Sequence, residues 1–355
     1  MKILIDINHP AHVHYFRNFI KEMENKGHEF CVINRDSKMI NDLLDYYGIK
    51  HITRNKRTKG NSTLASMINL TTMIIWCIRI SFSFRPDMYI GFGSAVCAIT
   101  SKLFCKPCIV IDDTEFNSIN HKLYMPNIAA VLTPFYFNKQ MGDGSKQFRF
   151  NGYVEQLYLH SKDYTSNDSI LKELNIRPKE YVIMRFSAYD AHHDKNINHF
   201  SEKDRIDFVN TIASKYKVLI SFEQNKVPES LKQYSLNISP NKIHDLMAYA
   251  KFMVTEGATM ASEAFVLGIP YLFIGSSKPL GNLDYQCKYY PDRAFRTMDK
   301  ENALDVIKKL MRNSTDVSFN KKELEKQTIR PTNYLIWFVE NYPMSLNMGY
   351  NEFEN

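Results

Sequence analysis

The feature that most constrains this fold is a rhythm of short apolar runs alternating with amphipathic segments, which occurs twice along the chain. In the first half, runs typical of buried strands predict strands at 2–7, 29–33, 50–53, 88–91, 108–111 and 130–133. Between the first two runs, Phe16, Phe19 and Met23 recur at helical spacing, and Gly27 ends the segment. Strands that alternate with helices form βαβ units, so we predict a Rossmann-like α/β domain with a parallel sheet.

The same rhythm restarts after a polar stretch at 161–169, with strands predicted at 181–186, 217–222, 252–255 and 271–274. A chain of 355 residues is also too long for one ordinary core. We therefore predict an N-terminal Rossmann-like domain over 1–155 and a second one over 156–328, with their sheets facing each other across a cleft. An aromatic helix over 329–345 is expected to pack back on the first domain.

Composition narrows the class of protein. The chain is 44% hydrophobic and 23% charged, which is typical of a globular protein. A net charge of +7 is spread along the chain without a long Lys/Arg tract, so no nucleic-acid partner is expected. The opening MKILIDIN is typical of a strand and not of a signal peptide. Most of the six cysteines lie in apolar runs, which favours reduced thiols and a cytoplasmic location.

One segment allows two interpretations. Residues 64–84 are largely apolar but contain Asn69 and Arg79, which argue against a membrane span. The basic residues Arg54, Lys56, Arg57 and Lys59 precede this segment. It is either a partly buried helix after a solvated loop or a peripheral contact with an anionic membrane, such as the inner face of the cytoplasmic membrane.

Three histidines follow the first predicted strand, in a loop that opens a helix. His9, His12 and His14 therefore lie where parallel sheets bind ligands. A neutral imidazole suits general-base chemistry near pH 7. A metal site is disfavoured because no carboxylate partner is adjacent, and helix capping is the structural alternative.

Two further groups follow later strands of the first half. Gly91-Phe92-Gly93-Ser94 lets a ligand approach the backbone at a helix N-terminus, although the full dinucleotide fingerprint is absent. Asp112, Asp113 and Glu115 suggest acceptor recognition or proton transfer, and capping of a helix is equally open. Their spacing is not that of a metal-dependent nucleotide site.

The most specific pattern lies at 255–270. It predicts the end of a strand, a turn with a glycine and a helix that ends at Gly268, and Pro270 then precedes another strand. The backbone N–H groups at 257–260 are predicted to cradle a diphosphate. Glu263, one turn into the helix, is predicted to accept hydrogen bonds from a ribose diol.

This last segment resembles the donor-binding segment of GT-B glycosyltransferases, in particular the lipid-linked N-acetylglucosaminyltransferases of peptidoglycan synthesis. On that resemblance, Ala11-His12-Val13 matches a Gly-Gly-His-Val loop, and 113–120 matches an acceptor-side His-Glu-Gln-Asn segment. Ser262-Glu263 matches a Ser-Glu pair, and Gln286 matches a glutamine that contacts the donor sugar. More closely still, IDINHPAHVHYF, IDDTEFNSIN and MASEAFVLGIPY resemble domain-of-unknown-function family 354.

The sequence also departs from these patterns. Pro10-Ala11 replaces paired glycines, and Arg185-Phe186-Ser187-Ala188 replaces a third glycine loop, where Arg185 offers its charge to a diphosphate. His192-His193-Asp194 has no counterpart. The epimerases that act on UDP-N-acetylglucosamine share the fold, but their His-Val-Glu-Ala-Gly segment is absent.

The resemblance implies an inverting glycosyltransferase that needs no metal or other cofactor. It would use a nucleotide-sugar donor, a UDP-sugar above all, and a sugar or lipid-linked sugar acceptor, in cell-surface polysaccharide or glycolipid synthesis. His12 is the expected general base, with Asp113 and Glu115 as further catalytic candidates. Expected donor-binding residues are Arg185, Gly257, Ala258, Thr259, Met260, Glu263 and Gln286. Expected acceptor-binding residues are His9, His14, Gly93, Ser94, Asn117 and Asn120. The alternatives are a sugar-nucleotide 2-epimerase and a non-catalytic nucleotide-sugar-binding protein.

Overall fold

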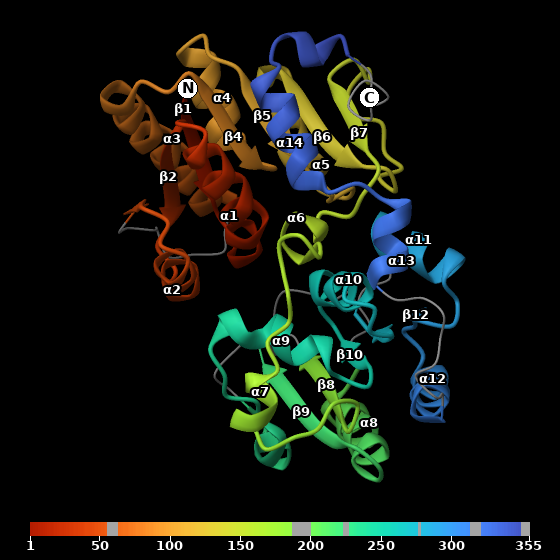
Figure 1. Ribbon diagram of the computed structural model, residues 1–355. Coiled ribbons are helices and arrows are strands. Elements are labelled where there is room, and N and C mark those ends of the chain that lie inside the picture. Colours follow the sequence, from red (N-terminus) through yellow and green to blue (C-terminus); the bar gives the residue numbers. More distant parts are fainter. Residues whose placement is uncertain (55–62, 187–199, 223–226, 276–277, 313–320, 349–355) are drawn as a thin grey trace. The chain divides into compact units, whose positions relative to one another are not determined.

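The computed structural model describes residues 1–54, 63–186, 200–222, 227–275, 278–312 and 321–348. The chain divides into two compact units (Figure 1). Unit 1 contains residues 1–158 and 328–355, and unit 2 contains residues 159–327. The second unit is therefore inserted between two stretches of the first, with changeovers within three residues of the predicted boundaries.

Unit 1 is built on a parallel sheet whose strands follow the order β3-β2-β1-β4-β5-β6-β7. The strands are β1 (Lys2–Ile7), β2 (Glu29–Arg35), β3 (His51–Arg54), β4 (Met88–Phe92), β5 (Cys108–Ile111), β6 (Ala130–Pro134) and β7 (Gln147–Phe150). The helices are α1 (Pro10–Asn25), α2 (Lys38–Tyr46), α3 (Thr63–Phe84), α4 (Ala95–Leu103), α5 (Ser118–Tyr124), α6 (Gln156–Leu159) and α14 (Pro331–Glu340), with short 3-10 turns at Met125–Asn127 and Met344–Leu346. The first six strands have the Rossmann order, which confirms the predicted fold class for this unit.

Alternate strand residues of unit 1 bury against different helices. Leu4 and Val110 face one core cluster, which also contains Met73 of α3 and Val96 of α4. On another part of the unit, α14 packs against α1, as Figure 1 shows. The C-terminal helix therefore belongs to the core of unit 1.

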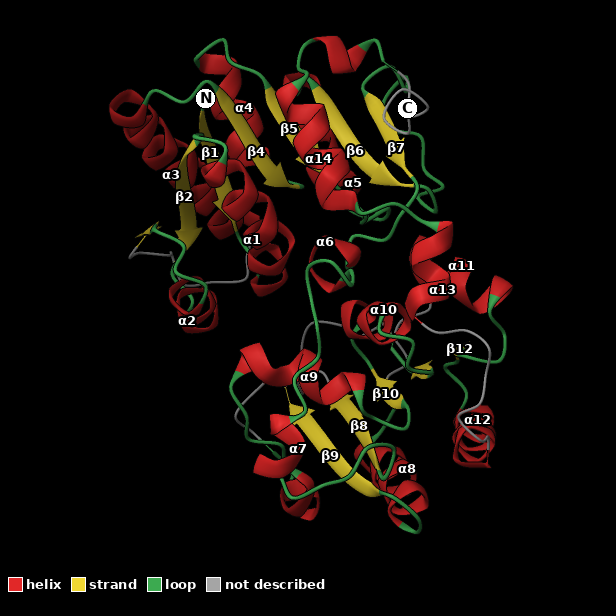
Figure 2. Ribbon diagram, viewed as in Figure 1, coloured by secondary structure: helices red, strands yellow, loops and turns green. Residues whose placement is uncertain are grey.

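Unit 2 has a five-stranded sheet in the order β12-β11-β10-β8-β9, again with parallel pairing throughout (Figure 2). The strands are β8 (Tyr181–Phe186), β9 (Lys217–Phe222), β10 (Met253–Thr255), β11 (Tyr271–Phe273) and β12 (Ala294–Arg296). The helices are α7 (Ser169–Glu173), α8 (Glu202–Ala213), α9 (Ile243–Ala248), α10 (Ala258–Val266), α11 (Gly281–Tyr289), α12 (Lys300–Arg312) and α13 (Lys321–Gln327), with 3-10 turns at Glu229–Tyr234 and Pro240–Lys242. In chain order this sheet reads 2-1-3-4-5, the other common doubly wound arrangement.

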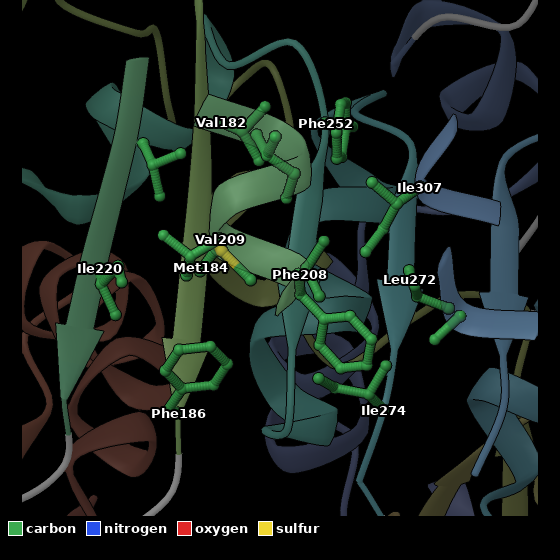
Figure 3. Packing of buried hydrophobic residues seen from close by; sticks show 14 of the residues in the cluster. Val182, Met184, Phe186, Phe208, Val209, Ile220, Phe252, Leu272, Ile274 and Ile307 are labelled. Carbon is green, nitrogen blue, oxygen red and sulfur yellow. The ribbon is translucent and has the colours of Figure 1, made fainter. Parts of the chain in front are cut away.

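The core of unit 2 lies between its sheet and helices α8 and α12. Met184, Phe208 and Ile307 pack there with other fully buried apolar side chains (Figure 3). Phe208 comes from α8 and Ile307 from α12, two helices that also contact each other. This core fixes strands β8 and β10, whose ends position the residues described below.

The structure corrects three expectations about local structure. Of the three histidines after β1, His12 and His14 do not lie in a loop, because α1 begins at Pro10 and includes both. Proline suits the first helical position, since its φ is already helical and its missing N–H has no partner there. Strands β7 and β12 were not predicted, because their sequences QFRF and AFR contain no continuous apolar run.

Candidate functional site

The carboxyl ends of β1, β4 and β5 bring several of the predicted residues of unit 1 to one edge of its sheet. β4 pairs with both β1 and β5, so residues that follow β1 and β5 lie about 10 Å apart. His12 follows β1, Ser94 follows β4, and Asp113 follows β5. This edge of a parallel sheet is the usual position of a ligand site.

The environment of His12 makes it a weak base. Burial, together with the positive charges of His9 and Arg35, lowers its pKa to about 3, so the imidazole is neutral at pH 7. The Asn8 backbone N–H donates to His12 Nδ1 over 3.4 Å, which leaves the proton of the neutral ring on Nε2. A base this weak is disfavoured for proton abstraction near pH 7, and the role of His12 as general base stays a prediction. The His12 ring packs 5.0 Å from Phe92 and offers a hydrogen-bond donor instead.

A carboxyl group that the sequence analysis did not single out lies near the end of β1. Asp6 is fully buried, and burial raises its pKa to about 6. Ser94 Oγ donates to Asp6 Oδ2 at 2.6 Å, and Asn8 Nδ2 donates to the same oxygen at 2.5 Å. Oδ1 has no hydrogen-bond partner among the described residues. A charged residue inside the apolar run ILIDI was the available signal for it.

Asp112 and Asp113 have different roles. Asp112 is buried and accepts hydrogen bonds from the Thr114 N–H and the Tyr124 hydroxyl, at 2.8 and 2.5 Å. Asp113 is partly buried and has a hydrogen bond from Thr114 Oγ1 at 3.1 Å. Burial and the neighbouring charge of Asp112 raise the pKa of Asp113 to about 7. Of the residues predicted to be catalytic, Asp113 is the one with the pKa of a general base.

Several other predicted residues of unit 1 make contacts within the protein. His14 is buried and stacks on Tyr158 with ring centroids 5.3 Å apart. His9 caps α1, since its Nδ1 accepts the Ala11 N–H at 3.2 Å. Glu115 Oε1 accepts the Asn138 N–H at 2.6 Å, which anchors the turn after β6.

The remaining predicted acceptor-side residues lie near the start of α4. Gly93 has a φ of +51°, and its carbonyl accepts from Asn120 Nδ2 at 2.5 Å. Ser94 caps α4 through the Cys97 N–H at 3.1 Å. Asn117 is exposed and makes no side-chain cap for α5.

In unit 2, the N-terminus of α10 lies at the carboxyl edge of the sheet, directly after β10. Gly257 is the N-cap and supplies no side-chain hydrogen bond to the helix. The first N–H groups of a helix have no acceptor within the helix, so those of Ala258, Thr259 and Met260 are available to an anion. These three residues are partly exposed.

Two arginines lie on the strands and helices around this turn. Arg205 of α8 binds both carboxylate oxygens of Glu256, at 2.8 and 2.7 Å, and both side chains are only 4% exposed. Arg185, at the end of β8, donates to Ser221 Oγ at 2.6 Å, and its carbonyl accepts the Glu256 N–H. Glu256 is thus held on both sides, which fixes the residue before Gly257.

Glu263 and Gln286 are buried, which corrects their predicted positions on a ligand surface. Glu263 Oε1 lies 2.9 Å from His244 Nε2, a partner that the sequence did not indicate. Gln286 is fully buried, and its amide joins the Tyr271 hydroxyl to Ser262 Oγ, at 2.8 and 3.3 Å. Both side chains hold α10 against α9 and β11 from beneath.

Within the described part of the chain, no group of three or more His, Cys, Asp or Glu side chains could hold a metal ion. Cys105 and Cys108 are both free thiols. Lys56, Arg57, Lys59 and His192-His193-Asp194 lie outside the described residues.

Helix α3 has an unusual outer surface for a core helix. It is long and apolar enough to cross a membrane, yet only 17% of its most apolar stretch is buried. Ile68, Ile75 and Phe82 recur every seven residues and are all exposed, Phe82 by 70%. Buried helices of globular proteins pass the same test of length and composition, but the described side chains of α3 leave this face uncovered.

Comparisons with known proteins agree with this architecture. Uncharacterized protein MJ0665 of Methanocaldococcus jannaschii is 24% identical over 322 residues, which are 86% of this chain and 91% of the relative. A putative UDP-N-acetylglucosamine 2-epimerase from Listeria monocytogenes has a TM-score of 0.69 at 13% identity, over 96% of each chain. The glycotransferase of kitacinnamycin has a TM-score of 0.62 at 11% identity, over 96% of this chain and 98% of that one.

At such low identities the solved structures show the fold alone, which is two Rossmann-like domains of the GT-B type. The resemblances stated from the sequence are confirmed at this level. A family model described as "Protein of unknown function (DUF354)" matches residues 1–336. Because that match covers nearly the whole chain, the chain belongs to the DUF354 family.

Proposed function

We propose that this protein transfers a sugar from a UDP-sugar to a hydroxyl acceptor, with inversion and without a metal ion. The observation that carries the proposal is the uncapped N-terminus of α10 at the carboxyl edge of unit 2. A helix N-terminus with available N–H groups stabilises the negative charge of a diphosphate. The folds named above support the choice of donor, because one belongs to a UDP-N-acetylglucosamine 2-epimerase and another to a glycotransferase.

Each unit contributes its own residues to the proposed chemistry. In unit 1, Asp113 takes the proton of the acceptor hydroxyl, since a pKa of about 7 leaves much of it ionised near neutral pH. His12 Nε2–H donates to the acceptor and orients it. The acceptor oxygen then bonds to the anomeric carbon while the bond from that carbon to the diphosphate breaks. The UDP leaves with its new charge against the N–H groups of α10 in unit 2.

The donor site is tested by removing one of these N–H groups without disturbing the helix. Ala258→Pro is suited to this, because proline is tolerated at the first position of a helix. We expect UDP binding, measured by calorimetry, to weaken by about ten- to a hundredfold, on the order of the 1.5–3 kcal/mol of one lost hydrogen bond to a charged group.

Glu202→Pro is the matched control, because Glu202 is the first residue of α8 in the same unit. It should leave UDP affinity unchanged. Equal UDP affinity of the wild type and Ala258→Pro, with both folded, would remove α10 from the donor site.

A sugar-nucleotide 2-epimerase is the second candidate, favoured by the similarity of fold to such an enzyme. The two activities differ in their need for an acceptor. Proton NMR of UDP-N-acetylglucosamine incubated with the protein alone would reveal the C2 epimer directly. A transferase leaves that spectrum unchanged, apart from slow hydrolysis, until an acceptor is added. A nucleotide-sugar-binding protein without activity would bind UDP-sugar and change it under neither condition.

We also propose that the exposed face of α3 lies on an anionic membrane. Ile68, Ile75 and Phe82 supply the apolar surface. The Phe82 ring contacts Phe104, and exposed Lys102 lies close to Phe104 in sequence, at the end of α4. Apolar and basic groups on one surface are the combination that binds anionic lipid. A lipid-linked acceptor would then reach unit 1 from the membrane.

A further inference from the structure

Unit 1 contains a pocket that is lined in part by Gly93, Ser94 and Asn120, three of the residues expected to bind the acceptor. It has a volume of about 290 Å³ and lies between the ends of β1 to β4, the start of α4 and one side of α3. Residues of α3 that line it, such as Asn69 and Met73, lie on the side of the helix opposite Ile68 and Ile75. The pocket is therefore separate from the apolar outer face of α3.

The polar wall of the pocket favours an anion. Arg35 is the last residue of β2, and Arg54 is the last residue of β3. Two neighbouring strands therefore each bring a guanidinium to the pocket. Arg54 donates to Thr72 Oγ1 at 2.6 Å and to the Asn69 carbonyl at 3.4 Å, which fixes its position against α3. A guanidinium has five N–H groups, so this arginine keeps donors for a ligand.

The start of α4 adds to this preference. Ala95 and Val96 line the pocket and are the first two residues of a nine-residue helix. Their N–H groups have no acceptor within the helix, and the helix end favours negative charge. Asp36, at the exposed rim, is the one carboxylate among the lining residues and suits a hydroxyl group of the ligand.

The rest of the wall fits a ligand that is more than a bare anion. The amides of Asn8 and Asn120 suit hydroxyl groups, and Leu70 and Met73 provide apolar surface. A space of about 290 Å³ is also larger than a phosphate ion needs, since a single water occupies about 30 Å³. Asn8 lines the pocket, and its backbone N–H donates to His12 Nδ1 at 3.4 Å, so the pocket adjoins the residue that we propose to orient the acceptor.

We propose that this pocket binds a phosphate group carried by the acceptor, so that the acceptor is a glycosyl phosphate ester and not a neutral sugar. The inference rests on the proposed function, because it names the substrate class of the same site. Arg35, Arg54 and the start of α4 hold the phosphate, while the sugar extends past Asn8 toward His12. Charge on the phosphate then places the acceptor hydroxyl at a fixed distance from Asp113.

The test is a binding measurement on the full chain without a donor. Calorimetry with glucose 1-phosphate, glucose and farnesyl phosphate separates the contributions of phosphate, sugar and lipid. Glucose 1-phosphate should bind at least tenfold more tightly than glucose. Arg35→Gln and Arg54→Gln should each weaken it about tenfold, the effect of a hydrogen bond to a charged group.

Two further variants distinguish a specific loss of binding from a loss of folded structure. Ser66→Glu adds a negative charge at an exposed position of the pocket wall and should abolish glucose 1-phosphate binding by repulsion. Arg79→Gln removes an exposed arginine from the other side of α3 and should bind like the wild type.

The outcomes test the proposal and distinguish a lipid-linked phosphate ester from a free sugar phosphate. Tighter binding of farnesyl phosphate than of glucose 1-phosphate identifies a lipid-linked ester, and the reverse order identifies a free sugar phosphate. Binding of glucose as tight as that of its phosphate, no binding of either phosphate ester, or unchanged affinity in all three pocket variants would overturn the proposal. UDP affinity is measured on the same samples, so a failure of the donor site is distinguished from a failure of this pocket.

Discussion

At the scale of single residues, surroundings decide the chemistry more than residue type does. Histidine is the usual general base near pH 7, yet burial and nearby positive charge lower the pKa of His12 to about 3. Aspartate is ordinarily ionised at that pH, yet burial and Asp112 raise the pKa of Asp113 to about 7. With these pKa values, Asp113 is better suited than His12 to accept a proton near pH 7.

Asp113→Asn should reduce transfer by about a hundredfold or more, because a positioned base contributes on that order. In the wild type, kcat/KM should rise with pH through a limb near 7, where Asp113 loses its proton. His12→Gln should lower the rate but keep this limb. A pH–rate profile of the three proteins checks the assignment, and loss of the limb in His12→Gln alone would return the base to His12.

Asp113→Asn should also change the free energy of unfolding, by an amount that depends on pH. The folded protein keeps a proton on Asp113 between pH 4 and 7 that the unfolded chain has lost, so the wild type loses stability as pH rises through this range. Asparagine does not titrate. The free energy of unfolding of Asp113→Asn, relative to that of the wild type, should therefore increase from pH 4 to pH 8. The increase should be at most about 4 kcal/mol, at 1.4 kcal/mol per pKa unit. Chemical denaturation at both pH values measures it, and a constant difference would contradict the raised pKa.

Glu263→Ala should destabilise unit 2 by about 3 kcal/mol, because it leaves His244 buried without its partner. The Glu263→Ala/His244→Ala double variant should cost less than the sum of the single variants. Denaturation curves of the four proteins test the pair. A fully stable Glu263→Ala with weakened UDP binding would instead support the ribose contact expected from the sequence.

At the scale of elements, two helices differ in the part of their surface that is exposed to solvent. α10 is buried along its length, where Glu263 contacts His244 of α9 and Ser262 contacts Gln286 of α11, and its N-terminus is left available. α3 buries Met73 and Cys77 and leaves an apolar stripe exposed. Helix length and composition do not distinguish these cases, because exposure depends on the neighbouring elements.

Replacement of the α3 stripe tests its contact with lipid. Ile68→Ser, Ile75→Ser and Phe82→Ser together should reduce sedimentation with vesicles that contain anionic lipid, since each removes apolar surface that would enter the bilayer. Tyr46→Ser is the control, as an exposed aromatic residue on α2. Vesicle binding that is unaffected by the triple change would place the contact elsewhere.

At the scale of the whole molecule, the sequence was sufficient for the architecture and insufficient for the details of the site. The strand at Lys2–Ile7 and the helix at Pro331–Glu340 follow from local apolar patterns, which the chain itself displays. The burial of Glu263 against His244 depends on α9, which lies nearly twenty residues earlier and has no distinctive pattern. Likewise, Arg35 and Arg54 become a pair only when β2 and β3 align, because no sequence spacing connects them.

The insertion of unit 2 within unit 1 also determines when each unit can be completed during synthesis. α14 packs on α1, and the Thr332 hydroxyl donates to the Leu157 carbonyl, so unit 1 needs residues beyond 327. At about 5–20 residues per second, the ribosome takes roughly 10–30 s to pass from residue 158 to residue 328. Throughout that interval all of unit 2 emerges while the surface that α14 will cover stays open. The N-terminal unit is therefore the last to be finished, and the nascent chain is most dependent on chaperones late in translation.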